Sequence, residues 1–434
     1  MPDKHEPVST HSDAASRPAR PRPPDAGRGE TVSIDGFMAR ALEIPGLLSL
    51  AAGFTDNGFL PCDEVRAIVD EILQAPGGSE TLQYGIPQGR ARLRRLVCEG
   101  LRAQDAELGA DPGELDPRHS IITNGSQQAL YMAVQALCVP GDIVLVESPT
   151  YFVFLDLLRG LGVDAIAMPA RDDRLVTREL PRFFAELKAS GQWSRIRAVY
   201  VVSYFSNPSG LSLDAQQKAA LLEAMDHEDL HVPILEDIAY RDLYFDEPWP
   251  VPTLLARETD AVPVLVTGTF TKSFSTGLKV GYAIVRNDRV RERMMTIKRG
   301  HDFGTSNFAQ AVVERALEEG ICASFLGPVR RHYERKCGIL HDALGAAGLR
   351  DLGWTWERSR GGLYLWLTAP AHISTSGDGE FFEVCLEEKV MYIPGELCYV
   401  RGGADKVRLS FGYLEEDSLP VAAERFVRAA RRLG

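Results

Sequence analysis

The chain has 434 residues, which is long enough for two domains. Of these residues 45% are hydrophobic and 25% are charged, a composition typical of globular proteins. Its formal net charge of −12 argues against nucleic acid as a partner, because nucleic-acid-binding proteins usually carry a basic face. No apolar run is long enough to cross a membrane, and the N-terminus has no apolar stretch typical of a secretory signal.

The predicted elements begin after a polar N-terminal segment. Residues 1–30 are rich in Pro, Arg, Asp and Ser, and we predict a disordered tail because few large apolar side chains are present. From about residue 60 to residue 300, short β-branched runs alternate with segments of helical spacing. The predicted strands are Ser120–Thr123, Ile143–Glu147, Ala165–Met168, Ala198–Val202, Pro233–Leu235, Pro263–Thr267 and Val280–Val285.

Segments with the residue spacing of helices lie between most of these strands. The predicted helices are Ser126–Cys138, Tyr151–Leu161, Ala215–Asp226 and Asp288–Arg299. Nearly continuous apolar strands that alternate with helices predict an α/β fold, with a mainly parallel seven-stranded sheet covered by helices on both faces. We therefore predict a large domain over residues 60–300.

The last third of the chain has a different pattern. Helices are predicted at Asn307–Glu319 and Pro328–Ala347, followed by strand-like runs at Gly362–Leu367 and Lys406–Phe411. This order predicts a smaller α+β domain, which we assign to residues 31–59 and 301–434.

Polar residues follow the ends of several predicted strands. They are Asn124-Gly125-Ser126-Gln127, Pro149-Thr150-Tyr151, Asn207-Pro208, Asp237 and Thr269–Lys272. In an open parallel sheet the ligand crevice lies outside the carboxyl ends of the strands, so we expect these segments to meet there.

Lys272 stands among Ser and Thr residues just after the apolar run Val262–Val266. A lysine in a loop is usually only a solvated charge. At the end of a buried strand, however, desolvation lowers the pKa of the amine and makes it a nucleophile toward a carbonyl group. The neighbouring hydroxyl groups suit the oxygens of a phosphate. Amine and hydroxyl groups together indicate pyridoxal phosphate, held through a Schiff base.

Two other segments are consistent with this cofactor. The segment Asn124–Gln127 ends a strand and opens a helix, where free N–H groups bind phosphate, although a simple N-cap by Asn124 or Ser126 is the alternative. Asp237 follows an apolar strand, where a buried carboxylate is costly unless it pairs with a cation or with several hydrogen-bond donors. A protonated pyridinium nitrogen is such a cation. The alternative for Asp237 is a cap of the next turn. Tyr240 is expected to point into the same crevice.

Asn207 and Tyr151 are further candidates with ordinary alternatives. Asn207-Pro208-Ser209-Gly210 is typical of a turn, but the Asn207 amide also donates and accepts hydrogen bonds at ligand oxygens. Tyr151 begins a helix and offers an aromatic face on which a ring stacks.

Taken together, roughly residues 45–430 resemble the fold-type I pyridoxal-phosphate-dependent aminotransferases of the class I/II family. The order and spacing of several short segments carry the resemblance. These segments are Leu82-Gln83-Tyr84-Gly85 with Gly89, Asn124–Ala129, Pro149-Thr150-Tyr151, Asn207–Gly210, Glu236–Tyr240, Thr269–Lys272 and Arg408-Leu409-Ser410.

The resemblance implies roles around the cofactor ring. Lys272 forms the Schiff base and moves the proton between the substrate and the cofactor. Asp237 pairs with the pyridine nitrogen. Asn207 and Tyr240 bind the phenolic oxygen of the ring, and Tyr151 stacks on its face.

The resemblance also implies a phosphate site and a carboxylate site. Its phosphate ligands are Ser126, Gln127, Thr269 and Lys279, with Tyr84 reaching across from a second subunit of a homodimer. Lys279 departs from the family pattern, because relatives usually have arginine there, and lysine lacks planar two-point recognition. Arg408 grips the substrate α-carboxylate as a bidentate fork, and Asn207 and the backbone at Gly53 complete that pocket.

The implied activity is transfer of an amino group from an L-amino acid to a 2-oxo acid, most often 2-oxoglutarate in such families, by a ping-pong mechanism. One alternative is another reaction with the same cofactor, such as decarboxylation, elimination or oxidation of an amino acid, because the fold does not decide the reaction. A second alternative is a ligand-sensing module, as in regulators with an aminotransferase-like domain behind a DNA-binding head. Residues 1–30 are too short and too rich in proline for such a head.

His227-Glu228-Asp229-Leu230-His231 matches the H-E-x-x-H zinc motif. The predicted helix ends at this point and no third ligand is evident, so we expect no metal site. The seven cysteines are scattered and lack C-x-x-C spacing, which favours a reducing, cytoplasmic location.

Overall fold

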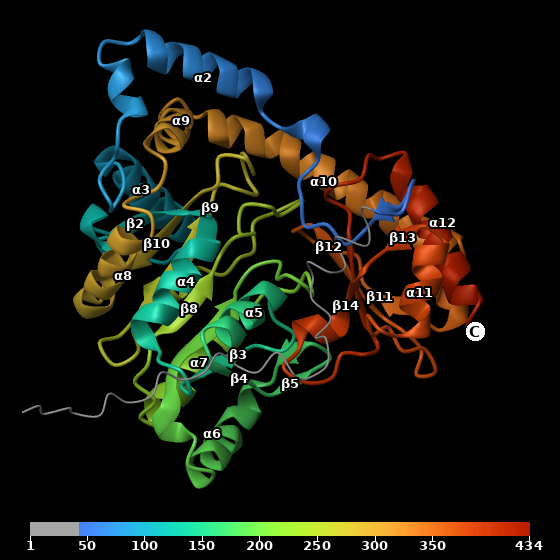
Figure 1. Cartoon of the computed structure of the whole chain (residues 1–434). Coiled ribbons are helices and arrows are strands. Elements are labelled where there is room, and N and C mark those ends of the chain that lie inside the picture. Colours follow the sequence, from blue (N-terminus) through green and yellow to red (C-terminus); the bar gives the residue numbers. More distant parts are fainter. Residues whose placement is uncertain (1–42) are drawn as a thin grey trace, which may run out of the picture.

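A seven-stranded sheet forms the centre of the computed structural model, which describes residues 43–434 (Figure 1). The tail predicted at residues 1–30 lies outside the described residues. The strand order is β2-β10-β9-β8-β7-β3-β4. The strands are β2 (Ser120–Asn124), β3 (Ile143–Val146), β4 (Asp164–Ala167), β7 (Ile196–Val202), β8 (Ile234–Asp237), β9 (Val264–Thr269) and β10 (Val280–Val285). β10 runs antiparallel to both of its neighbours, whereas the other pairings are parallel, so the predicted mainly parallel seven-stranded sheet is confirmed.

Both faces of this sheet are buried under helices. Along β3, Ile143 and Leu145 join one apolar cluster, whereas Val144 and Val146 join the other, because successive strand residues point to opposite faces. The second cluster includes residues of α4 (Gly125–Leu137), α5 (Phe152–Gly160) and α8 (Asp288–His301). The first includes residues of α2 (Cys62–Gln74), α3 (Ala91–Glu107), α6 (Leu180–Ala189), α7 (Ala215–His227) and α9 (Asn307–Glu318). Doubly buried strands explain why each appears in the sequence as a nearly continuous apolar run.

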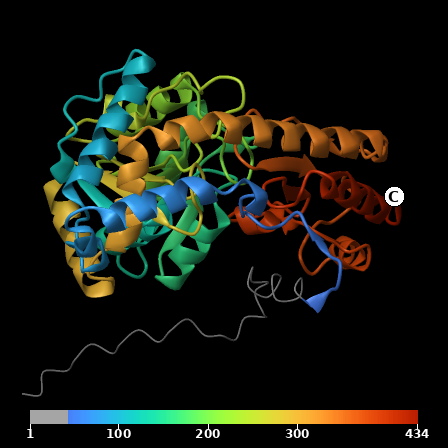
Figure 2. The same cartoon turned by 90° about the horizontal axis from the view of Figure 1, so that it is seen from above.

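Helix α10 (Ile321–Ala346) runs from α9 toward the C-terminal elements (Figures 1 and 2). The helical segment predicted from the sequence is Pro328–Ala347. That boundary is wrong, since the helix begins at Ile321 and continues through Pro328. Cys322 and Val329 are buried on either side of the proline, and tertiary packing of this kind offsets the hydrogen bond that proline cannot make. Within residues 43–434, neither α10 nor another helix combines the length and the apolar character needed to cross a membrane.

A smaller, antiparallel sheet lies beside the large one. Its order is β11-β12-β15-β14, with β11 (Thr355–Trp356), β12 (Tyr364–Thr368), β14 (Ile393–Pro394) and β15 (Lys406–Ser410). Helices α11 (Glu380–Glu387) and α12 (Ser418–Arg431) accompany it, and β1 (Leu48–Ser49) pairs in parallel with β13 (Val390–Met391). A short hairpin joins β5 (Ala170–Arg171) and β6 (Arg174–Leu175). The domain limits assigned from the sequence stay a prediction.

Candidate active site

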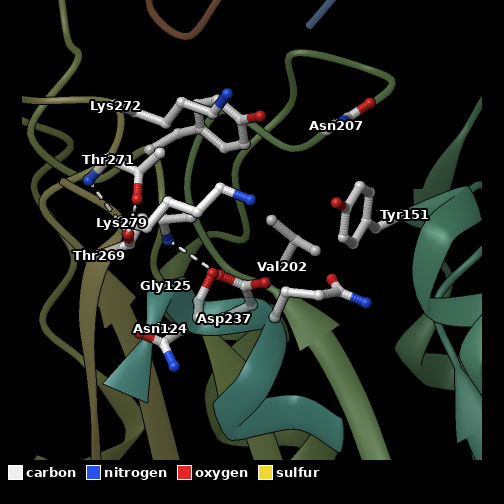
Figure 3. Close-up of a pocket in the computed structure, with 14 residues that line it drawn as sticks. Asn124, Gly125, Tyr151, Val202, Asn207, Asp237, Thr269, Thr271, Lys272 and Lys279 are labelled. Carbon is white, nitrogen blue, oxygen red and sulfur yellow. Dashed lines mark hydrogen bonds between the residues drawn. The ribbon is translucent and has the colours of Figure 1, made fainter. Parts of the chain in front are cut away.

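A cavity of about 180 Å³ opens at the carboxyl ends of the parallel strands (Figure 3). Its lining residues are Asn124, Gly125, Ser126, Gln127, Tyr151, Val202, Asn207, Asp237, Ala239, Tyr240, Thr269, Thr271, Lys272 and Lys279. Nine of the residues that we proposed from the sequence as cofactor ligands belong to this lining. Lys279 reaches the same edge because it directly precedes β10, which runs antiparallel to its neighbours.

Lys272 lies in the turn between β9 and β10 and points into the cavity (Figure 3). Its Nζ donates a hydrogen bond of 2.6 Å to the carbonyl oxygen of Gly53. Burial lowers the pKa of the amine to about 8, and the positive charges of Arg408 and Lys279 act in the same direction. Since no carboxylate of residues 43–434 pairs with Lys272, nothing in the described chain offsets this lowering, and the amine loses its proton more readily than an ordinary lysine.

Asp237 is the last residue of β8 and is almost completely buried. Its Oδ1 accepts from the backbone N–H of Ala239 at 2.9 Å, and its Oδ2 accepts from the hydroxyl of Tyr200 at 3.2 Å. Burial raises the pKa of this carboxyl to about 6 despite these two donors, and the charge of Glu236 adds to the rise. In the described chain no cation pairs with Asp237. The site thus fits a ligand that brings a positive charge to this carboxylate.

The first turn of α4 faces the same cavity without a side-chain cap. Asn124 precedes the helix, but its Nδ2 donates to Asp302 at 3.0 Å, and Ser126 lies inside the helix. The alternative of an ordinary N-cap is therefore wrong. A side chain at Gly281 would place its Cβ 2.5 Å from the carbonyl carbon of Gly125, so only glycine lets β10 approach this turn. The N–H groups of the helix start remain open to an anion.

Further polar groups surround the helix start. The hydroxyl of Thr269 donates to that of Thr271 at 2.6 Å, and the Oε1 of Gln127 is buried without a hydrogen-bond partner in residues 43–434. Lys279 adopts a left-handed backbone with φ of 53°, which is uncommon for a residue with a side chain. Its ammonium group adds a positive charge to this end of the cavity.

Arg408, on β15, forms the second charged region of the site, and only 2% of its surface is exposed. Its Nη1 donates to the Oδ1 of Asn207 at 2.7 Å, and its Nη2 donates to the carbonyl oxygen of Ala51 at 2.6 Å. The Nε has no partner in the described residues. Asn207 lines the cavity and also holds Arg408, so it joins the two regions.

The sequence motifs missed several residues at the site. Tyr364 on β12 places its hydroxyl 2.9 Å from that of Tyr240. Tyr200 on β7 donates a hydrogen bond from its hydroxyl to the Oδ2 of Asp237. Val202 and Ala239 also line the cavity. No signal in the sequence marks Tyr364, Tyr200 or Val202, because aromatic and aliphatic side chains in strands are typical of an ordinary core, whereas Ala239 belongs to the segment Glu236–Tyr240 quoted above.

Tyr84 and the zinc-like motif lie away from the cavity. Tyr84 is 85% exposed and packs edge to face on Phe303, with ring centroids 6.2 Å apart. Helix α7 ends at His227, so His231 does not lie on that helix, while Glu228 pairs with Lys188 at 2.8 Å. No cluster of three metal-binding side chains occurs among residues 43–434.

Comparison with known proteins agrees with this geometry. The profile of the family described as "Aminotransferase class I and II" matches residues 46–426. A 2-aminoadipate transaminase of Thermus thermophilus is 30% identical, over 94% of this chain and 96% of its own. The kynurenine aminotransferase of Pyrococcus horikoshii, solved in complex with PMP, is 27% identical with a TM-score of 0.82 and covers 92% of this chain and 94% of its own. YisV, an uncharacterized HTH-type transcriptional regulator of Bacillus subtilis, is 27% identical over 89% of this chain and 74% of its own. The chain therefore belongs to the class I and II aminotransferases, which are pyridoxal-phosphate-dependent enzymes of fold type I.

Proposed function

We propose that this enzyme transfers the amino group of an L-amino acid to 2-oxoglutarate in two half-reactions of a ping-pong mechanism. Donor and acceptor both carry a carboxylate, and the buried Arg408 offers both the same binding place in turn. The observation that carries the proposal is the environment of Lys272: its half-buried amine faces the cavity, has no carboxylate partner among residues 43–434, and has a pKa that burial lowers to about 8.

Pyridoxal phosphate, when bound, supplies an electron sink that makes the α-hydrogen of an amino acid acidic. We assign to Lys272 both the attachment of the cofactor and the movement of the α-proton. An amine with a pKa of about 8 suits this work, because acid–base catalysis is most efficient when the pKa lies near the working pH. In the cofactor-free protein, the hydrogen bond to the carbonyl oxygen of Gly53 holds the amine in place, and the bond to the cofactor would replace this hydrogen bond.

Three residues are proposed to hold the cofactor ring and a fourth to pack on it. Asp237 pairs with the pyridine nitrogen, since a cationic partner offsets the cost of burying its charge. Asn207 and Tyr240 donate to the phenolic oxygen, because both line the same cavity as Asp237. Tyr151 lies at the cavity wall and stacks on the ring (Figure 3).

We assign the phosphate to the first turn of α4 and the residues around it. Ser126 and Gln127 lie in that turn, and Thr269 and Lys279 face it from the ends of β9 and β10. The absence of a side-chain cap on α4 supports this assignment, because the free N–H groups and the helix dipole favour an anion.

Arg408, Asn207 and the backbone at Gly53 are proposed to bind the substrate α-carboxylate. The buried and unpartnered Nε of Arg408 supports this role, because such a charged group is costly to bury without an anion. The hydrogen bonds of Arg408 to Asn207 and Ala51 fix the plane of the guanidinium.

A homodimer in the cytoplasm is the proposed form of the enzyme. Leu82, Tyr84, Ile86 and Phe303 are large apolar side chains that stay exposed in the single chain, and a second copy of the chain would cover them. Tyr84 of one subunit then reaches the phosphate of its partner. The free cysteines, most of them buried, favour a reducing compartment.

A panel of L-amino acids offered with 2-oxoglutarate tests the proposed reaction. Mass spectrometry is expected to detect glutamate together with the 2-oxo acid of the donor. Formation of carbon dioxide or free ammonia, without glutamate, contradicts transamination and favours decarboxylation or elimination.

A further inference from the structure

Tyr364 brings a buried hydroxyl group into the site that none of the proposed roles explains. The residue is 1% exposed, and its Oη lies 2.9 Å from the Oη of Tyr240. Tyr364 belongs to β12 of the small sheet, whereas Tyr240 follows β8 of the large sheet. The contact between the two hydroxyl groups therefore joins the two sheets at the cavity.

Either hydroxyl group could donate in this contact, and the surrounding hydrogen bonds together with the role proposed for Tyr240 give it a direction. Arg408 donates to the Oδ1 of Asn207, so the amide nitrogen of Asn207 is the atom that faces Tyr364, and it donates to the Tyr364 oxygen at 3.5 Å. Tyr364 accepts from Asn207, and its own hydrogen is free for the Tyr240 oxygen. When Tyr240 donates to the cofactor, it must accept from Tyr364. The donors then point in series from Asn207 through Tyr364 and Tyr240 into the cavity.

Packing fixes the Tyr364 side chain from two sides. The guanidinium carbon of Arg408 lies 4.3 Å from the centroid of the Tyr364 ring. A Cβ atom at Gly53 would come within 2.9 Å of the Tyr364 hydroxyl, so glycine is needed there to leave room for it. Gly53 also accepts from Lys272, which places the hydroxyl next to the segment that holds the reactive amine.

We propose that Tyr364 is a positioning residue that donates a hydrogen bond to Tyr240 and thereby orients the Tyr240 hydroxyl toward the phenolic oxygen of the cofactor. This inference rests on the function proposed above for Tyr240. Hydrogen bonds in series polarise one another, so the Tyr364 donor makes Tyr240 a stronger donor. A stronger donor to the phenolic oxygen lowers the proton affinity of the neighbouring nitrogen through which Lys272 holds the cofactor.

The test is the pH dependence of the visible absorbance of the cofactor-loaded protein without substrate. Tyr364→Phe keeps the ring but removes the hydroxyl. We expect the midpoint of the absorbance change with pH to rise by about half a pH unit, in keeping with the modest net strength of one neutral hydrogen bond. Tyr240→Phe is expected to raise the midpoint further, and adding Tyr364→Phe to that variant is expected to change nothing more. Gly53→Ala, which crowds the same hydroxyl, is expected to shift the midpoint in the same direction.

Tyr392→Phe is the matched control. Tyr392 is also fully buried, and its hydroxyl donates to the carbonyl oxygen of Thr375 at 3.0 Å, away from the cavity. We expect its midpoint to equal that of the parent. An unchanged midpoint in Tyr364→Phe, or an equal shift with and without the Tyr240 hydroxyl, overturns the positioning role. Absence of any cofactor absorbance linked to Lys272 in the parent protein overturns the proposed function instead.

Discussion

Two consecutive carboxylates on β8 have opposite surroundings. Glu236 is completely buried, and its oxygens accept from Lys218 at 2.8 Å, from Ser203 at 2.6 Å and from the N–H of Leu254 at 2.8 Å. Asp237 points to the other face of the same strand, where two neutral donors contact it and no cation of the described chain does. Glu236 therefore forms an ion pair within the fold, whereas the charge of Asp237 has no cationic partner among residues 43–434.

The buried Lys218 and the half-buried Lys272 repeat this difference. Lys218 donates to Glu236 and to the carbonyl oxygen of Pro252, also at 2.8 Å, so its charge is balanced within the fold. Lys272 donates to one carbonyl oxygen and has no anion among residues 43–434. Removing one partner of a buried ion pair leaves the other charge uncompensated and destabilises the fold, whereas a desolvated charge without an internal partner indicates a ligand site.

The largest expected effect separates these two lysines. We expect Lys272→Ala to lower turnover by at least about a thousandfold, because it removes both the attachment point and the group that moves the proton. Lys218→Met is expected to lower the free energy of unfolding by about 3–5 kcal/mol instead, since Glu236 stays buried without its cation. Turnover and denaturant unfolding of both variants measure the contrast. Substantial turnover in Lys272→Ala contradicts the assignment.

The two carboxylates provide the next test. Asp237→Asn is expected to lower turnover by about a hundredfold or more, because the cofactor loses the negative charge that we assign to its ring nitrogen. Glu236→Gln is the matched change on the other face of β8, and it is expected to weaken folding because Lys218 loses its partner. If Glu236→Gln lost turnover at full stability, the division of roles along β8 would be wrong.

Lys279 tests the phosphate end of the site. We expect Lys279→Ala to weaken cofactor binding by about tenfold to a hundredfold, since it removes one charge-assisted contact. Lys279→Arg keeps the charge and is expected to retain most of the affinity. Titration of the cofactor-free protein with pyridoxal phosphate, followed by absorbance, measures both. Equal affinity in Lys279→Ala and the parent shows that the phosphate lies elsewhere.

The smallest expected effect concerns how the stability of the cofactor-free protein depends on pH. Burial raises the pKa of Asp237 from 3.8 to about 6, so the folded state binds more protons than the unfolded state between these values. Asp237 therefore costs stability as the pH rises through this window, and the cost remains at pH 7. We expect Asp237→Asn to be more stable than the parent at pH 7 by about 2–3 kcal/mol, and the difference to shrink near pH 4. Urea unfolding at several pH values measures it, and a constant difference contradicts an uncompensated carboxylate.

The sequence predicted the large sheet and most of the cavity for physical reasons. Strands buried on both faces are apolar at most positions, and polar side chains at or just after the ends of such strands are conspicuous, as at Asp237 and Lys272. The topology then brings the carboxyl ends of the strands to one edge. Local pattern and general sheet geometry were sufficient here.

Other features depend on contacts between distant elements and were not predictable in this way. Tyr364 looks like a core residue of a strand until the two sheets are placed side by side. Lys218 looks like a solvated residue of a helix, although it is buried against Glu236. The start of α10 at Ile321 depends on packing that outweighs the proline at position 328.

The most direct measurement of the central claim is the site of cofactor attachment. The protein is loaded with pyridoxal phosphate, reduced with borohydride, digested and mapped by mass spectrometry. The account predicts one fixed adduct on Lys272, with Lys218 and Lys279 unmodified. An adduct on another lysine, or none at all, would contradict the claim that the Lys272 amine at the sheet edge is the reactive centre.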